Sequence, residues 1–66
     1  MRECYCIKIH FSDSISRFTL GMNKDAPYEF IKLEIDKNGD VYMYQRNGEV
    51  QYYHGFKVEA FYRQKQ

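Results

Sequence analysis

The stretch DKNGDVYMYQRNGE (residues 36–49) contains two Asn-Gly pairs, at residues 38–39 and 47–48, with the run Val-Tyr-Met-Tyr between them. Asn-Gly is a strong signal of a tight β-hairpin, because both residues tolerate the positive φ angles that such turns require. The flanking residues alternate between apolar and polar, as in half-buried strands. The stretch therefore predicts a central strand with a hairpin at each end, within an antiparallel meander over residues 28–54.

The length of the first hairpin loop decides which side chains of the meander share a face. A three-residue loop over residues 37–39, with Gly39 in the left-handed conformation, pairs Ile35 with Val41. A two-residue turn would place Val41 beside a charged residue instead. Because the three-residue loop separates apolar from polar side chains, we predict that loop.

At the second hairpin the same criterion favours a two-residue turn formed by Asn47 and Gly48. This turn pairs Met43 with Tyr52, so that both lie on the apolar face. A three-residue loop there would move Val50 and Tyr52 to the opposite face. We therefore predict the two-residue turn at this end of the central strand.

These two registers give the meander one apolar face and one aromatic face. The apolar face, expected to be the core, carries Ile31, Leu33, Ile35, Val41, Met43, Val50 and Tyr52. The opposite face carries Tyr28, Phe30, Lys32, Glu34, Tyr42, Tyr44, Arg46, Gln51 and Tyr53. From the second face we select as candidate binding residues Tyr28, Phe30, Lys32, Tyr42, Tyr44, Arg46 and Tyr53.

Two further strands are predicted by the alternation of residues 3–11 and 16–22. The tail over residues 57–64 fits both a strand and a short helix, and the absence of a strong helix N-cap favours the strand. The predicted fold class is all-β, an antiparallel meander curled into a five- or six-stranded barrel or a two-layer sheet. The alternative is an α+β sheet with one short C-terminal helix. We expect a single domain over residues 1–66.

Because the chain is small, a binding partner would help to stabilise its fold. A domain of 66 residues buries only roughly 60% of the surface that its unfolded chain exposes. Cys4 and Cys6 are separated by about 6.5 to 7 Å along a strand, too far for a relaxed disulfide, and are expected to act as small apolar groups. No signal peptide or membrane span is predicted, so we expect a cytoplasmic protein. Self-association or a larger partner would supplement the small core.

Metal and catalytic motifs are weak. In DKNGD the glycine is the fourth residue, whereas a calcium-binding loop needs it at the sixth. Cys4, Cys6, His10 and His54 lack the spacing of a zinc site. No nucleophile lies in a recognisable catalytic context. The prediction is a protein without catalytic activity, metal or cofactor.

The aromatic face has three interpretations, which the sequence alone leaves open. It is a second core layer under the N-terminal hairpin, a protein interface, or a stacking platform for single-stranded nucleic acid. The net charge of +1 gives no strong attraction to nucleic acid. The favoured prediction is a binding protein that acts as an inhibitor or adaptor by occupying a surface on a larger protein. A homodimer is also plausible. From its small size alone, we expect that the protein could come from a virus, such as a phage, or from a mobile element.

Overall fold

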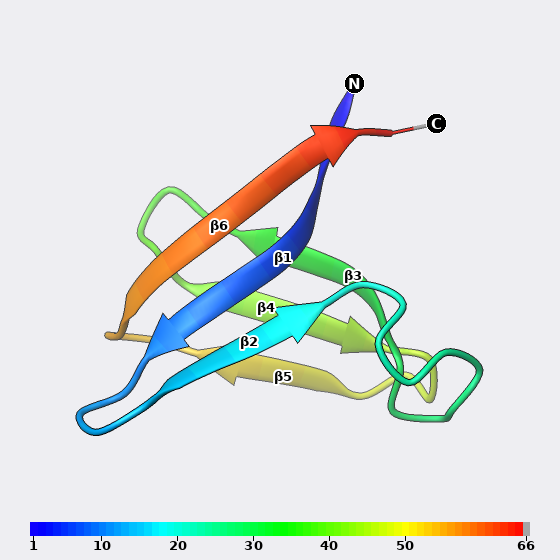
Figure 1. The fold of residues 1–66 in the computed structure, drawn as a ribbon, viewed down its shortest axis with the longest axis horizontal. Helices are drawn as coiled ribbons and strands as arrows, with labels where there is room; N and C mark the ends of the chain where they lie inside the picture. Colours follow the sequence, from blue (N-terminus) through cyan, green and yellow to red (C-terminus); the bar gives the residue numbers. More distant parts are fainter. Residues whose placement is uncertain (66) are drawn as a thin grey trace.

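The computed structural model describes residues 1–65, which form β-strands and no helix; Gln66, the last residue of the predicted domain, lies outside the described residues. The strands are β1 (Arg2–His10), β2 (Ile15–Thr19), β3 (Phe30–Ile35), β4 (Val41–Gln45), β5 (Val50–Tyr53) and β6 (Lys57–Gln64). They make two three-stranded antiparallel sheets within residues 1–65, in the orders β2-β1-β6 and β3-β4-β5 (Figure 1). The predicted all-β fold is confirmed in its two-layer form.

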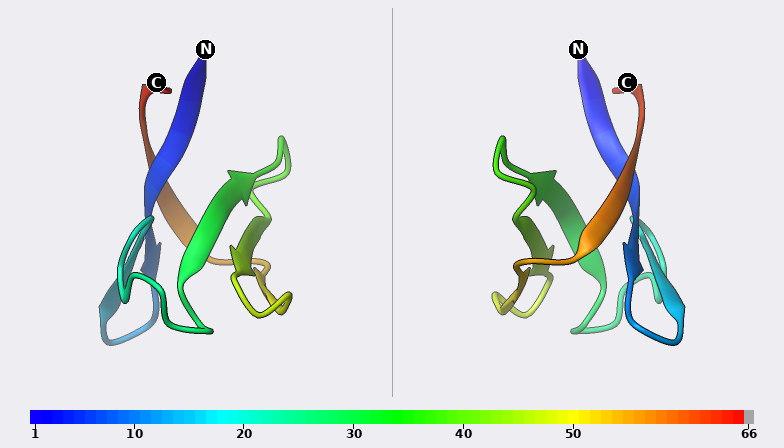
Figure 2. Two further views of the ribbon diagram at one scale, coloured as in Figure 1. Left: turned by 90° about the vertical axis from the view of Figure 1, so that its right-hand side faces the viewer. Right: turned by 90° about the vertical axis from the view of Figure 1, so that its left-hand side faces the viewer.

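Two further predictions about architecture are settled by these sheets. They face each other as layers, as the edge-on views of Figure 2 show, and do not close into a barrel. The tail is strand β6, so the alternative with a C-terminal helix is wrong. Strand β6 pairs with β1, which places the two ends of the chain side by side (Figure 1).

The core lies between the inner faces of the two sheets. Ile7 and Ile9 from β1 and Val41 and Met43 from β4 have no exposed surface. The partly buried hydrophobic residues that pack around this centre come from both sheets and from the adjoining loops: Phe11, Phe18, Leu20, Phe30, Ile35, Tyr53, Val58 and Ala60. Each sheet therefore uses one face for the core and leaves its other face outward.

A bulge in β1 interrupts the alternation expected at the N-terminus. Cys4 pairs with Tyr62 and Cys6 with Phe61, so Tyr5 is an extra residue in the ladder. As a result Cys4 belongs to the core, whereas Cys6 lines a pocket on the outer face. Regular alternation over residues 3–11 predicts both cysteines on one face, and the bulge makes that prediction wrong. Their expected role as small apolar groups is confirmed, since each is 7% exposed and free.

The first hairpin has the predicted register. Ile35 pairs with Val41, and the neighbouring apolar pair on the same face is Leu33 with Met43. Gly39 has a φ of +83°, the left-handed conformation that a residue with a Cβ adopts at a cost. The Asp36 backbone N–H donates to the carbonyl of Asp40 over 3.0 Å and closes the three-residue loop.

The second hairpin does not have the predicted register. Its loop also contains three residues, 46–48, with Gly48 at a φ of +91°. The Gln45 N–H donates to the Glu49 carbonyl over 2.8 Å. The physical reason lies partly outside the hairpin, because the loop amides of residues 46 and 47 donate to the carbonyls of Glu29 and Pro27. These contacts anchor the longer loop against the segment that enters β3.

This change of one residue reverses the faces of β5. Val50 and Tyr52 point outward, with 47% and 52% of their surface exposed, so their assignment to the core is wrong. Tyr53 points inward and forms aromatic contacts with Phe11, Phe18 and Phe56 at ring-centroid distances of 6.0, 6.2 and 6.0 Å. The assignment of Tyr53 to the aromatic outer face is therefore wrong as well.

A second bulge has the same effect at the start of β3. Phe30 pairs with Gln45 and Lys32 with Tyr44, which leaves Ile31 as the extra residue. Ile31 is 52% exposed and is not in the core, contrary to prediction. Phe30 packs against the core, with its ring 5.7 Å from that of Phe18, so its predicted place on the outer face is wrong.

The register of β5 predicts different roles for two adjacent tyrosines. Replacing Tyr53 with alanine removes a ring from the aromatic cluster and is expected to lower the free energy of unfolding by about 2 kcal/mol or more. Replacing Tyr52 with alanine should cost less than about 1 kcal/mol, because this ring lies on the surface. Chemical denaturation measures both values. Tyr53→Phe, which keeps the ring, is the control, and a larger loss for Tyr52→Ala would contradict the register.

Candidate binding surface

The outer face of the β3-β4-β5 sheet carries a group of tyrosines that the other sheet does not cover. We define the tyrosine face as Ile31, Lys32, Glu34, Tyr42, Tyr44, Val50 and Tyr52. Tyr42 and Tyr44 are half-buried, whereas the other members are exposed. The β1-β2 hairpin packs on the inner side of this sheet, against Leu33, Val41 and Met43. The tyrosine face is therefore an open surface and not a second core layer.

Contacts within the face hold the rings in place. The rings of Tyr42 and Tyr52 are paired across β4 and β5, with centroids 5.1 Å apart. The Tyr44 hydroxyl donates to Glu34 Oε1 over 2.9 Å. The ammonium of Lys32 lies 5.4 Å from the centroid of the Tyr44 ring, within the range of a cation–π contact. Because the rings are restrained before any partner arrives, binding would lose less side-chain entropy.

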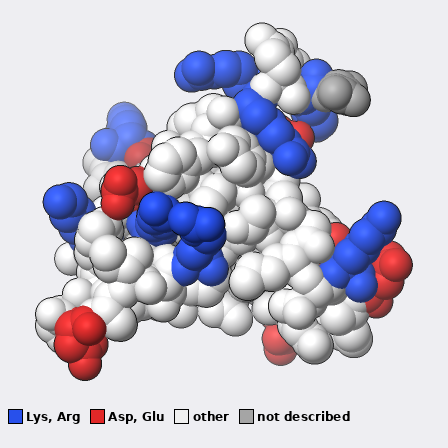
Figure 3. Space-filling view, in the orientation of Figure 1, with Lys and Arg blue, Asp and Glu red and all other residues white. Residues whose placement is uncertain are grey.

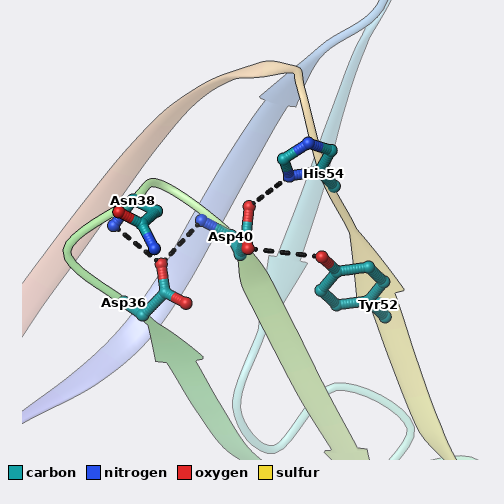
Figure 4. Close-up of polar contacts among 5 residues, drawn as sticks. All are labelled: Asp36, Asn38, Asp40, Tyr52 and His54. Atoms are coloured by element: carbon teal, nitrogen blue, oxygen red, sulfur yellow. Dashed lines mark hydrogen bonds and ion pairs between the residues drawn. The ribbon is translucent and has the colours of Figure 1, made fainter.

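Asp40 extends the face to His54, as Figure 4 shows. One carboxylate oxygen of Asp40 accepts from Nδ1 of His54 over 2.5 Å, and the other accepts from the Tyr52 hydroxyl over 3.2 Å. The rings of Tyr52 and His54 are stacked, at 7° to each other with centroids 6.5 Å apart. Asp36 in turn accepts from the backbone N–H of Asp40 over 3.0 Å. The first hairpin loop thus positions the carboxylate that orients both rings.

Burial and neighbouring carboxylates both raise the pKa values of the tyrosines on this face. The hydrogen bond to Glu34 raises the pKa of Tyr44. Burial is the main reason why the pKa of Tyr42 is raised, and the charges of Asp36 and Asp40 add to the effect. Burial and then Asp40 likewise raise the pKa of Tyr52. These shifts indicate a negative potential at the phenol ends of the rings.

The structure brings together three of the candidate binding residues predicted from sequence. Lys32, Tyr42 and Tyr44 share the tyrosine face, in the cross-strand pairs Lys32 with Tyr44 and Glu34 with Tyr42. Tyr28 is 54% exposed but precedes β3, outside the sheet. Phe30 and Tyr53 point into the core, as described above.

Arg46, the remaining candidate, is engaged in a structural contact. Oε1 of Glu29 accepts from Nε and Nη2 of Arg46, over 3.0 and 2.7 Å, and from the backbone N–H of Asp25 over 2.8 Å. Glu29 is buried, at 7% exposure. The guanidinium therefore ties the second hairpin to the segment that connects the two sheets.

Sequence reasoning missed Val50, Tyr52 and His54 as members of this surface. The signal that could have found His54 is its spacing of two residues from Tyr52, which places both on one side of an extended chain. Within residues 1–65 no three His, Cys, Asp or Glu side chains are grouped as metal ligands. No helix in that part of the chain has the length and apolar character needed to cross a membrane.

No protein-family model, curated protein or solved structure matches this chain.

Titration of His54 tests the Asp40 contact. The hydrogen bond to Asp40 raises the pKa of His54 above its ordinary value of 6.5. A raised folded-state pKa means that the stabilisation is fully present below pH 6.5 and is lost as the pH rises through the raised value. NMR titration of the imidazole should show the raised pKa, and Asp40→Asn should return it toward 6.5. A wild-type value at or below 6.5 would contradict the contact.

The Glu29 contact predicts the opposite pH dependence. The hydrogen bond from Arg46 lowers the pKa of Glu29 from its ordinary value of 4.5. The resulting stabilisation is present above pH 4.5 and is lost as the pH falls through the lowered value. Glu29→Gln should therefore lower the melting temperature more at neutral pH than in acid, as thermal unfolding at a series of pH values would show. Glu49→Gln, on the exposed hairpin loop, is the control; an equal effect of Glu29→Gln at all pH values would refute the ionic contribution.

Proposed function

We propose that this protein is a non-enzymatic binding protein that attaches to a larger protein through the tyrosine face, as an inhibitor or an adaptor. The observation that carries the proposal is the exposure of Ile31, Val50 and Tyr52 beside Tyr42 and Tyr44 on one uncovered sheet face. Tyrosine is enriched among the residues that dominate protein interfaces, because it supplies a large apolar area with little conformational entropy. Contiguous exposed apolar surface of this kind marks interaction sites.

The charge around the face supports a basic partner segment. Glu34 accepts from the Tyr44 hydroxyl and Asp40 from the Tyr52 hydroxyl, and after burial the charges of Asp36, Asp40 and Glu34 add to the raised pKa of Tyr42. An arginine of a partner could stack on an exposed ring and pair with a carboxylate at the same time. We therefore propose a partner surface that combines arginine or lysine with apolar side chains.

The same charges argue against single-stranded nucleic acid on this face. Phosphate groups would approach the three carboxylates that surround the tyrosines. Arg46, one of the candidate binding residues selected from the sequence, is already bound to Glu29. A stacking platform needs rings and available cations together, and the tyrosine face supplies mainly the rings.

A homodimer through this face is also disfavoured. Two-fold symmetry places the same patch on both subunits. Each copy would bring Glu34, Asp36 and Asp40 to the interface against one cation of the face, Lys32, so negative charge would be in excess there. We also propose a cytoplasmic location, as expected from the sequence, where two free thiols would stay reduced.

The test compares two serine variants in affinity capture from nuclease-treated host lysate. Tyr52→Ser with Val50→Ser removes exposed apolar side chains from the tyrosine face. Ile15→Ser with Met22→Ser removes two exposed apolar side chains, 59% and 44% exposed, from the other half of the molecule. A protein retained by the wild type and the control but lost by the tyrosine-face variant would support the proposal. With that protein purified, the dissociation constant should rise about 30-fold, as for loss of a hot spot of about 2 kcal/mol.

Two outcomes would refute the proposal. One is equal retention by both variants, which would place the interface elsewhere. The other is capture of nothing but a second copy of the chain, which would replace the larger partner with self-association. Glu34→Gln tests the charge of the partner separately: it should weaken binding and reduce its salt dependence if the partner is basic.

A further inference from the structure

The outer face of the other sheet carries an unusual pair of cations. Lys8 on β1 lies directly opposite Arg17 on β2 in the antiparallel ladder. Like charges in directly opposite positions destabilise a sheet. Lys57 and Arg63 on β6 lie on the same outer face. Figure 3, which views this face, shows Lys and Arg side chains gathered over β1 and β2.

The carboxylates on this face are engaged elsewhere. Glu59 lies opposite Lys8 on β6, but its Oε2 accepts from Nε2 of His10 over 2.6 Å. Glu3 pairs with Arg63 over 3.2 Å. Within residues 1–65, neither Lys8 nor Arg17 has a carboxylate oxygen within ion-pairing distance. Glu59 attracts Lys8 from the opposite strand without forming an ion pair, so among residues 1–65 the repulsion between the two cations is only partly offset.

A pocket of about 230 Å³ opens beside the two cations. Its lining consists of Tyr5, Cys6, Lys8, Arg17, Thr19 and Phe61. Cys6 is buried, and the Thr19 hydroxyl donates to its sulfur over 3.6 Å, a weak bond that leaves the hydroxyl free to turn to a better acceptor. The volume is below the roughly 300 Å³ of common ligand sites, so the pocket suits one small unit.

Two cation–π contacts border the pocket. The Lys8 ammonium lies 5.5 Å from the centroid of the Phe61 ring, and the Arg63 guanidinium lies 5.3 Å from that of Tyr5. An anion held by Lys8 would therefore lie beside the Phe61 ring. Bases stack on such rings with a gain of about 1 to 3 kcal/mol each, so a flat group attached to the anion would take the face of Phe61 that Lys8 leaves when its ammonium turns toward the anion.

We propose that this pocket binds a nucleotide unit, with the phosphate between Lys8 and Arg17 and the base against Phe61. Phosphate offers several oxygens, so it can accept from the ammonium, the guanidinium and the Thr19 hydroxyl together. The site is on the opposite sheet from the tyrosine face and does not depend on the function proposed for that face. The unit is either a free nucleotide or part of a single strand, since both present the same chemistry.

The test is an NMR titration of isotope-labelled protein at low salt with adenosine monophosphate, adenosine and an eight-residue deoxyadenosine oligonucleotide. Adenosine monophosphate and the oligonucleotide should shift the backbone amides of Lys8, Arg17 and Phe61, and adenosine should bind at least tenfold more weakly. Oligonucleotide binding at least tenfold tighter than that of the mononucleotide identifies a single strand as the source, and equal binding identifies a free nucleotide.

Matched double variants test the role of the cations. Lys8→Gln with Arg17→Gln should weaken oligonucleotide binding at least tenfold and reduce the salt slope by about 0.7, as for the loss of one phosphate contact. The melting temperature should stay equal or rise, because a like-charge pair is removed. Lys24→Gln with Lys37→Gln makes the same change in net charge at exposed positions outside the pocket and the tyrosine face, and should change binding less than twofold. Arg17→Gln alone, at an exposed position, serves if the double variant does not fold.

Three outcomes would overturn the proposal. The first is that neither nucleotide probe shifts the amide resonances of the protein at millimolar concentration and low salt. The second is that the control variant loses as much affinity as the pocket variant, which would mean attraction by net charge alone. The third is that a polyglutamate peptide binds as tightly as the oligonucleotide, which would make the pocket a site for acidic protein segments.

Discussion

The arrangement of this small protein depends on two hairpin loops that are each closed by a left-handed glycine. Gly39 and Gly48, with φ angles of +83° and +91°, lie at the two ends of β4 and fix its register against β3 and β5. With both loops three residues long, Val41 and Met43 point into the core, while Tyr42 and Tyr44 point out. A shift of one residue at either loop would exchange the faces of the attached strand.

Local patterns in the sequence were sufficient to predict the parts of the fold that local contacts determine. Alternation located the strands before the tail, and the absence of a helix N-cap favoured a strand for the tail itself. The segregation of apolar residues identified the first loop, whose closing bonds lie within residues 36–40. The same reasoning predicted the wrong length for the second loop, because the loop amides donate to the carbonyls of Pro27 and Glu29, which are distant in the chain. The bulges at Tyr5 and Ile31 also leave no mark on the alternation, since they arise from pairing with the neighbouring strand.

These errors explain which parts of the tyrosine face could be predicted. Lys32, Tyr42 and Tyr44 depend on the first hairpin and were placed correctly. Val50 and Tyr52 depend on the second hairpin, so they were assigned to the core, and Tyr53 took their place on the surface. An aromatic, partly charged outer face was nevertheless predictable, because β4 alternates tyrosine with apolar residues whatever β5 does.

The two outer faces separate the charges of a nearly neutral chain. Lys8, Arg17, Lys57 and Arg63 lie on one sheet with Glu3 and Glu59, whereas Glu34, Asp36 and Asp40 surround the tyrosines of the other. A net charge of +1 therefore conceals two surfaces of opposite character. Because a fold of two thin layers leaves both outer faces uncovered, two partners could bind at once without competing for area. Simultaneous occupation of both faces would make the protein an adaptor, whereas an inhibitor needs one face alone.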